Sequence, residues 1–205
     1  HDYEPYARKR DAEIEKFLKS KDISFHTFKD QVIFEKDEIV KDDGKPYVVY
    51  TPYSNKWKEK FSGENIRQHH SEKKLNQIAN HKYPFLSLKD IGFEKSKVKV
   101  EDFDISRKVI ENYKETRDFP ALDSTSYLSP HLRFGTVSIR KLVNWANRKN
   151  QTFLSELIWR EFFIQILFSF PNCVNHNFKP AYDGIQWRNN EEDFKHWCSG
   201  TTGYP

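Results

Sequence analysis

The sequence predicts an α/β region followed by an all-α region, with a polar stretch between them. In residues 7–61, helical and strand-like patterns alternate, as they do in α/β domains. Residues 62–100 are rich in Lys, Asn, His, Gln and Ser, and from Asp102 onward the apolar periodicity is helical. We therefore expect the end of an α/β domain at 1–61, a connector at 62–100, and a helical domain at 101–205.

The first part combines one amphipathic helix with short candidate strands. Apolar residues spaced among charges predict a helix over 7–19. Short alternating, β-branched or aromatic runs predict strands at 23–28, 31–35 and 47–50. A short helix is expected after the last of these, through Trp57.

The connector is expected to lie on the surface. A few apolar residues are predicted to anchor it: Tyr83, Phe85, Leu86 and Phe93. His69, His70 and His81 have no partner set at metal-ligand spacing, so a solvated loop is preferred over a metal site.

The helical part is expected to begin with a helix that reaches Arg117 and is broken by Pro120. A hydroxyl-rich loop follows over 123–130, and either Thr136 or Ser138 can cap the next helix. Near the end, Asn190 is a candidate cap for a last short helix with an acidic first turn, and Gly200 can terminate it.

One long helix, 153–168, is the central element of this part. It contains no Gly or Pro, Asn150 or Thr152 can cap its start, and Pro171 follows its end. Apolar residues surround most of it, which is typical of a helix buried inside a larger body.

The polar exceptions in this helix share one face. Glu156, Trp159, Arg160 and Phe163 stand at i, i+3, i+4 and i+7, so a carboxylate, a large aromatic plane and a guanidinium lie together. Such a mixture suits a flat ligand with polar edges. The alternative is a buried helix with a single Glu–Arg pair and a core Trp.

Composition limits the possible classes of protein. The chain has 205 residues, 31% of them charged, and a net charge of +4, which permits an anionic partner without requiring one. No apolar run is long enough to cross a membrane. Cys173 and Cys198 have no metal-ligand spacing and suggest a reducing compartment, so we expect a cytoplasmic location. The chain contains no Met, even at position 1, which leads us to expect a piece of a longer protein.

Several motifs, in the right order, resemble the photolyase/cryptochrome family. The stretch 156–163, Glu-Leu-Ile-Trp-Arg-Glu-Phe-Phe, is similar to its signature helix, and 125–135 resembles its flavin-phosphate loop. The closing Gly-Thr-Thr-Gly-Tyr-Pro of 200–205 resembles a third hallmark, and 28–34 with 51–53 resemble the end of its N-terminal α/β domain. The motif Ile-Trp-Arg-Glu-Phe at 158–162 is most similar to that of class I cyclobutane pyrimidine dimer photolyases.

This resemblance implies light-driven DNA repair. It implies a Rossmann-like fold for the α/β part and a helical domain that binds FAD. In the family, the enzyme flips a pyrimidine dimer out of the duplex, and excited reduced flavin donates an electron that opens the cyclobutane ring. The expected partner is therefore damaged DNA, and the expected oligomeric state of the full-length protein is monomeric.

The resemblance also assigns cofactor-binding residues. Tyr113 corresponds to an aromatic that packs on the flavin near its phosphates. The loop residues that would hold the pyrophosphate are Thr125, Ser126, Leu128 and Ser129. Short hydroxyls and exposed N–H groups suit phosphate oxygens. The alternative for this segment, taken in isolation, is an ordinary Ser/Thr turn. Arg160 and Phe153 correspond to flavin-pocket residues. Phe153 stands where many relatives have Trp, and Tyr127 where many have Arg.

Further positions are assigned to DNA and to electron transfer. Glu156 resembles the catalytic carboxylate that hydrogen-bonds the thymine edges, and Trp159 resembles the ring that stacks on the flipped dimer. Arg117 resembles an Arg that meets a DNA phosphate; its alternative is a solvated cation at a helix end. Trp187 resembles the outermost member of a tryptophan chain that reduces the flavin, with a half-buried surface Trp as the alternative.

The resemblance leaves some questions open. Members of the family are about twice this length, so we expect the remaining flavin contacts and the two inner tryptophans outside this chain. Tyr6 and Ala7 replace an Asn-Glu pair of folate-binding relatives, so a folate antenna is doubtful and a deazaflavin or no second chromophore is expected. The rival functions are a cryptochrome-type photoreceptor, a plain nucleic-acid-binding module, and an inactive fragment with DNA-binding capacity only.

Overall fold

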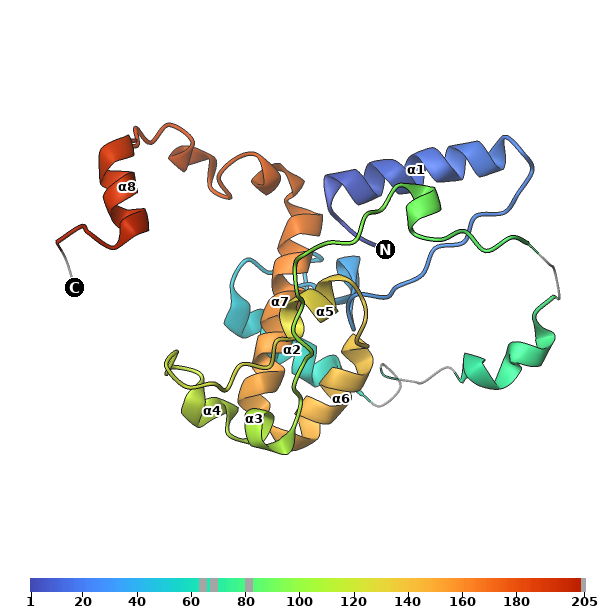
Figure 1. Ribbon diagram of the computed structural model, residues 1–205, viewed down its shortest axis with the longest axis horizontal. Helices are drawn as coiled ribbons and strands as arrows, with labels where there is room; N and C mark the ends of the chain where they lie inside the picture. The colour runs from blue at the N-terminus through green and yellow to red at the C-terminus, as the bar shows by residue number, and fades with distance from the viewer. Residues whose placement is uncertain (63–65, 67–69, 80–82, 204–205) are drawn as a thin grey trace. The chain divides into compact units, whose positions relative to one another are not determined.

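The computed structural model describes residues 1–62, 66, 70–79 and 83–203, which form two compact units, His1–Ser169 and Phe170–Pro205. The α-helices of the first unit are α1 (Pro5–Lys19), α2 (Tyr50–Lys60), α3 (Arg107–Glu111), α4 (Tyr113–Thr116), α5 (Leu128–Arg133), α6 (Ile139–Lys149) and α7 (Gln151–Ser169) (Figure 1). Its short 3₁₀ turns are η1 (Lys36–Glu38), η3 (Ser71–Gln77) and η4 (Lys89–Ile91).

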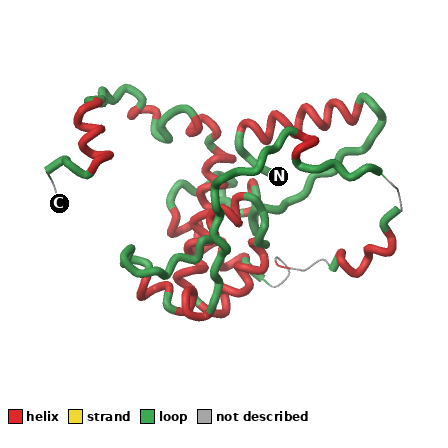
Figure 2. The backbone as a smooth tube through the Cα atoms, viewed as in Figure 1, coloured by secondary structure: helices red, strands yellow, loops and turns green. Residues whose placement is uncertain are grey.

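The α/β prediction for residues 1–61 is wrong as a statement about secondary structure. Among the described residues no β-strand forms, and strand-like pairing is limited to one isolated bridge between Val40 and Pro46 (Figure 2). The helix predicted over 7–19 is confirmed as α1, and the helix predicted through Trp57 is confirmed as α2. The candidate strands at 23–28 and 31–35 are irregular segments without a sheet, with bends at positions 31, 33 and 34, and the candidate strand at 47–50 is a loop that ends where α2 begins.

Side chains from α6 and α7 take the place of neighbouring strands for the segment 28–35. Two N–H groups of the segment, those of Ile33 and Phe34, donate to the Glu161 carboxylate at 2.7 and 2.9 Å. Arg140 donates to the carbonyls of residues 29 and 30 at 3.1 and 2.9 Å. Arg160 donates to the carbonyl of residue 31 at 2.6 Å. Five backbone groups that a sheet could pair are therefore satisfied by side chains instead.

The long helix predicted at 153–168 is confirmed as α7, and α2, α4, α6 and η1 all pack against it. Of the two candidate caps, Asn150 is the one used: its Oδ1 accepts the N–H groups of Thr152 and Phe153 at 2.9 and 3.0 Å. The core draws on both ends of the first unit; its innermost side chains are Ile33, Ile39, Tyr53, Trp57, Ile110, Leu142, Val143, Leu154 and Ile158.

The helix expected to reach Arg117 is divided into α3 and α4 at Asn112, whose φ of −90° and ψ of 6° leave the helical region. Ser106 caps α3 by accepting the N–H of Val109 at 3.4 Å. Of the two candidates for the next cap, Ser138 precedes α6 and accepts the N–H of Lys141 at 3.5 Å. The break at Asn112 turns α4 toward the start of α7.

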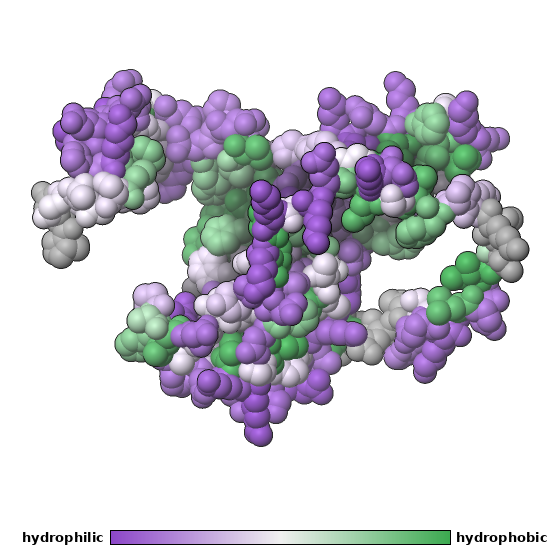
Figure 3. Space-filling model, viewed as in Figure 1, coloured by the Kyte–Doolittle hydropathy of each residue, from purple (hydrophilic) through white to green (hydrophobic). Residues whose placement is uncertain are grey.

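The described part of residues 62–100 is almost entirely exposed. The predicted anchors are wrong, because Phe85 is 98% exposed and Tyr83, Leu86 and Phe93 are exposed as well. Leu75 and Ile78 are also exposed. Hydrophobic and hydrophilic surface lie side by side on η3 (Figure 3). The division into domains at 1–61, 62–100 and 101–205 stays a prediction.

The second unit contains η5 (Pro171–Val174), η6 (Pro180–Tyr182) and α8 (Glu191–Ser199). Both predicted ends of α8 are confirmed. Asn190 accepts the N–H groups of Glu192 and Asp193 at 2.9 and 3.1 Å, and Gly200 terminates the helix with a φ of +69°. No helix in the described part of the chain has the length and apolar character needed to span a membrane.

Candidate functional site

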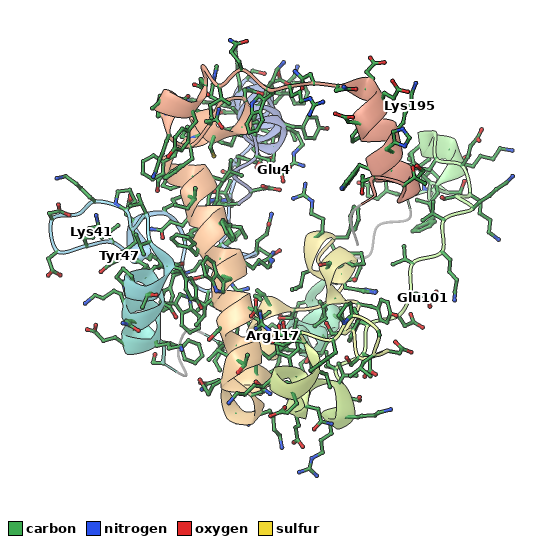
Figure 4. The ribbon with its side chains drawn as sticks, turned by 90° about the vertical axis from the view of Figure 1, so that its left-hand side faces the viewer. Glu4, Lys41, Tyr47, Glu101, Arg117 and Lys195 are labelled. Carbon is green, nitrogen blue, oxygen red and sulfur yellow. The ribbon has the colours of Figure 1, made fainter. Side chains whose placement is uncertain are left out.

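The structure brings four of the predicted site residues together where α4 meets the first turns of α7. Arg117, directly after α4, forms an ion pair with Glu156 on α7 (Figure 4). The guanidinium carbon of Arg117 also lies 5.4 Å from the centre of the Tyr113 ring. Tyr113 in turn packs edge-on against Phe153, with ring centres 5.2 Å apart. A cation, a carboxylate and two aromatic rings therefore share one part of the surface.

The electrostatics of this group follow from the ion pair. The Glu156 carboxylate, through its hydrogen bond and its charge, raises the pKa of the Arg117 guanidinium. Partial burial raises the pKa of the Tyr113 hydroxyl, and the charge of Glu156 raises it further. About a third of each paired side chain remains exposed, 35% for Arg117 and 34% for Glu156, so both can still meet an external ligand.

Trp159 lies one turn further along α7 from Glu156 and belongs to an aromatic cluster. Its ring is stacked on Tyr50, with ring centres 3.6 Å apart and planes within 6° of parallel. Phe162 meets it edge-on at 5.7 Å, and Phe163 lies at 5.5 Å with a tilt of 24°. Trp159 is partly exposed and Phe163 is 60% exposed, so the cluster reaches the surface next to Glu156.

Arg160 and Ser129 line a cavity of about 300 Å³ between α5, α7 and the N-terminal segment. Arg133 is also in its wall and is paired with Glu4 at 2.8 Å. Burial lowers the pKa of the Arg160 guanidinium. Because Arg160 donates to the carbonyl of Gln31, it holds the 28–35 segment against α7 whether or not it also contacts a ligand.

The candidate phosphate-binding residues occupy a loop and the helix that follows it. Thr125 and Ser126 precede α5, and Tyr127 opens it in the left-handed conformation, with a φ of +51°. Leu128 is buried, so only its backbone could contact a phosphate, whereas Ser129 is exposed in the first turn of α5. The predicted loop over 123–130 therefore ends three residues earlier than expected.

Sequence reasoning missed Glu161. It is 3% exposed and accepts the N–H groups of Ile33 and Phe34 and, at 2.7 Å, the indole N–H of Trp57. Burial raises the pKa of this carboxyl to about 7, against the three hydrogen bonds, which lower it. The signal available in the sequence was a carboxylate on the apolar side of α7, at i+4 from Leu157 and i+3 from Ile158, but its partners lie more than a hundred positions away.

The remaining predicted positions fall elsewhere. Trp187 belongs to the second unit and its side chain is 70% exposed there. This exposure is greater than that of the half-buried surface Trp considered as the alternative. On α1, Tyr6 is exposed and Ala7 is buried. No group of His, Cys, Asp and Glu with metal-binding geometry occurs among the described residues; His69 and His81 lie outside them.

Comparison with known proteins covers the whole chain. The family model described as DNA photolyase matches residues 1–74, and the model described as the FAD binding domain of DNA photolyase matches residues 153–205. Deoxyribodipyrimidine photo-lyases of Halobacterium salinarum and Alkalihalophilus pseudofirmus are 31% and 30% identical; they align with 100% and 97% of this chain and with 48% and 45% of their own length. The chain thus spans about half the length of these relatives.

A solved structure shows the same fold. The class III photolyase from Agrobacterium tumefaciens superimposes with a TM-score of 0.74 at 28% identity, covering 100% of this chain and 47% of that one. The two family models match the two ends of the chain in the order in which the sequence motifs occur, and the relatives align across the middle as well. This chain therefore belongs to the DNA photolyase family.

Proposed function

We propose that the protein to which this chain belongs repairs cyclobutane pyrimidine dimers in DNA with light and FAD. The observation that carries the proposal is the arrangement of Arg117, Glu156 and Trp159 on one part of the surface. A guanidinium suits a DNA phosphate, a carboxylate suits the N–H edge of a thymine, and an indole plane suits a base. The names of the relatives support the same reaction.

The residues present also fit the cofactor. Ser129 and Arg160 line the same cavity, and Thr125 and Ser126 stand in the loop just before α5; hydroxyl and guanidinium donors of this kind suit a pyrophosphate. Tyr113 and Phe153, already packed on each other, offer apolar surface to an aromatic ring system. When bound, reduced FAD supplies the photo-excited electron that opens the cyclobutane ring. For the antenna, the proposal is a deazaflavin or no second chromophore, because Tyr6 and Ala7 replace the Asn-Glu pair of folate-binding relatives.

The chain's own residues then position and stabilise the substrate. Trp159 stacks on the flipped dimer, and Glu156 accepts a hydrogen bond from a thymine N–H, which holds the dimer in register. Arg117 binds a phosphate beside the lesion; because it is paired with Glu156, its approach to DNA also releases part of that carboxylate for the base. Trp187 supplies electrons to oxidised flavin in the same proposal.

The experiment is a repair assay on the whole protein. Its absorption spectrum should show flavin, and blue light should restore intact thymines in a DNA duplex that carries one dimer, while a dark control should not. Bound flavin without repair would favour the cryptochrome-type photoreceptor instead. Absence of flavin with equal affinity for damaged and undamaged DNA would favour the plain nucleic-acid-binding module.

The finer assignment to the class I enzymes remains part of this proposal. It rests on the Ile-Trp-Arg-Glu-Phe motif at 158–162. The similar solved structure, by contrast, is described as a class III photolyase. Substrate tests with single-stranded and double-stranded DNA, together with the second absorption band of any antenna chromophore, would separate the two.

A further inference from the structure

The ring of Tyr50 lies flat against the ring of Trp159. Their centres are 3.6 Å apart and their planes 6° from parallel, which is contact distance over most of the ring area. The two residues belong to different helices, since Tyr50 is the first residue of α2 and Trp159 is in the middle of α7. The contact is therefore made by the packing of two helices and not by local sequence.

Tyr50 is itself held in place by α7. Its hydroxyl donates a hydrogen bond of 2.9 Å to the carbonyl of Ser155, one turn before Trp159. Its ring meets Phe162 edge-on at 6.0 Å, and Phe162 meets Trp159 in the same way at 5.7 Å. The hydrogen bond and the two aromatic contacts restrict the orientation of the Tyr50 ring, and the stacked contact in turn restricts the orientation of the indole.

We propose that Tyr50 is a positioning residue of the dimer-binding site, which fixes the plane of Trp159 for stacking. This inference rests on the function proposed above. Since Tyr50 covers one face of the indole, a base stacks on the ring surface that Tyr50 and the inclined ring of Phe163, 5.5 Å away at 24°, leave uncovered. With its plane already set, the indole loses less conformational freedom when the base arrives. The contact with Tyr50 thus contributes to affinity without touching the DNA.

The test compares variants that alter the stack by different amounts. Tyr50→Leu keeps apolar bulk but removes the flat ring, whereas Tyr50→Phe keeps the ring and removes only the bond to Ser155. We expect Tyr50→Leu in the whole protein to weaken binding to dimer-containing DNA about three- to tenfold and to leave binding to undamaged DNA unchanged. Tyr50→Phe should bind the dimer nearly as well as the parent protein.

Phe61→Leu is the matched control. Phe61 directly follows α2 and stacks on Trp57, with ring centres 4.8 Å apart and planes within 12°, far along the same helix from Tyr50. Both Leu variants lose one aromatic stack on a tryptophan, and both should lower the melting temperature. Only Tyr50→Leu should affect dimer binding; equal losses of affinity would show a general effect of α2 packing and overturn the proposal.

A double-mutant cycle separates this inference from the function on which it rests. In a Trp159→Ala background, Tyr50→Leu should cause no further loss of dimer affinity, because Tyr50 acts through the indole. Additive losses of affinity would overturn the positioning role while leaving the repair function intact. Tighter dimer binding by Tyr50→Leu would do the same, since it would show that the Tyr50 ring blocks the face of the indole on which the base stacks. Unchanged dimer affinity in Trp159→Ala alone would remove both the role of Tyr50 and the proposed stacking site.

Discussion

At the scale of single residues, the ion pair of Arg117 and Glu156 joins two groups to which the sequence assigned separate partners. Either side chain can bind DNA only if the ion pair weakens, because each charge already has a partner of opposite sign in the absence of DNA. Their effects on affinity for the dimer are therefore expected to be coupled, although one acts on a phosphate and the other on a base.

We predict that Glu156→Ala lowers the repair yield per absorbed photon more than it lowers affinity for the dimer. A hydrogen bond to the thymine edge strengthens as negative charge develops on the reacting base, so its loss is felt more in the reacting state than in the ground state. The yield is measured at saturating dimer concentration. Arg117→Gln is the companion variant and should weaken binding, most strongly at low salt, while the yield at saturation stays near that of the parent protein.

Glu161 gives the molecule a pH-dependent component of stability. Its carboxyl has a pKa of about 7 in the folded chain against an ordinary value of 4.5, so between these values the folded state binds the proton more tightly than the unfolded state. The contribution of Glu161 to the free energy of unfolding is therefore most favourable below pH 4.5. It decreases as the pH rises to about 7 and is constant above that pH. The full change in the free energy of unfolding is about 3 kcal/mol.

The prediction is tested with urea unfolding midpoints across this pH range for the parent and for Glu161→Gln. The Gln variant should be less stable overall, since its amide cannot accept from all three N–H donors, and the difference between the two proteins should grow toward low pH. A constant difference from pH 4.5 to 8 would show that Glu161 keeps an ordinary pKa in spite of its burial.

At the scale of elements, Asn150 connects two helices. Its side-chain carbonyl caps α7, and its amide donates to the backbone carbonyls of Ile110 and Glu111 at the end of α3, at 2.9 and 3.2 Å. The start of α7 and the end of α3 are therefore held by one side chain. Since α4 follows directly, the cap also influences where Arg117 stands.

We predict that Asn150→Ala lowers the free energy of unfolding by about 2 kcal/mol, the upper end of the range for a helix cap, because the α3 carbonyls also lose their donor. Asn150→Asp keeps the cap acceptor but not the amide, so it should show a smaller loss. Asn190→Ala, at the exposed cap of α8, is the control for a cap without a second role. An effect of Asn150→Ala no larger than that of Asn190→Ala would show that the link to α3 contributes nothing.

Helical elements were largely predictable from the sequence because their signals are local. The start of α7 at Asn150, the cap at Ser138 and the ends of α8 all depend on residues within one turn of the helix end. Periodicity likewise placed Glu156 and Trp159 on neighbouring turns of one helix. The same local reasoning failed at 23–35, where the β-like pattern predicted strands and the backbone is irregular, with bends at positions 31, 33 and 34.

Long-range contacts of the site could not be predicted in the same way. Glu156 is paired with a residue 39 positions earlier, although Arg160 is its nearest cation in the helix. Trp159 stacks on Tyr50, and the segment at 31–34 is held by α7 across separations of 127 to 129 positions. No periodicity in a single sequence encodes such pairs. They depend on how the helices pack.

At the scale of the whole molecule, residues from both ends of the first unit share one core. Tyr53 and Trp57 of α2 are buried in the same cluster as Leu154 and Ile158 of α7. The described stretch 83–100 that lies between these helices in the sequence is exposed and carries no core residue. The first unit is therefore held together by its shared core and not by the covalent connection through residues 83–100.

We predict that proteolytic cleavage within 83–100 leaves two pieces that remain associated. The accessible backbone should be cut first, and the shared core together with the Glu161 contacts should keep α2 on α7. Limited digestion followed by size-exclusion chromatography and mass spectrometry provides the measurement. Separate elution of the two pieces without denaturant would show that the connection, and not the core, maintains the unit.

The attachment of the 28–35 segment by Arg140, Arg160 and Glu161 has a consequence for how the protein is made. Ile33 leaves the ribosome 128 residues before its acceptor Glu161. At ordinary rates of synthesis this interval is roughly 6 to 26 seconds. During that time the segment has neither a sheet nor a helix to pair its backbone, and its buried Val32, Ile33 and Phe34 are exposed to other chains. We therefore expect this segment to be a chaperone-binding stretch of the nascent chain until α7 has been synthesised.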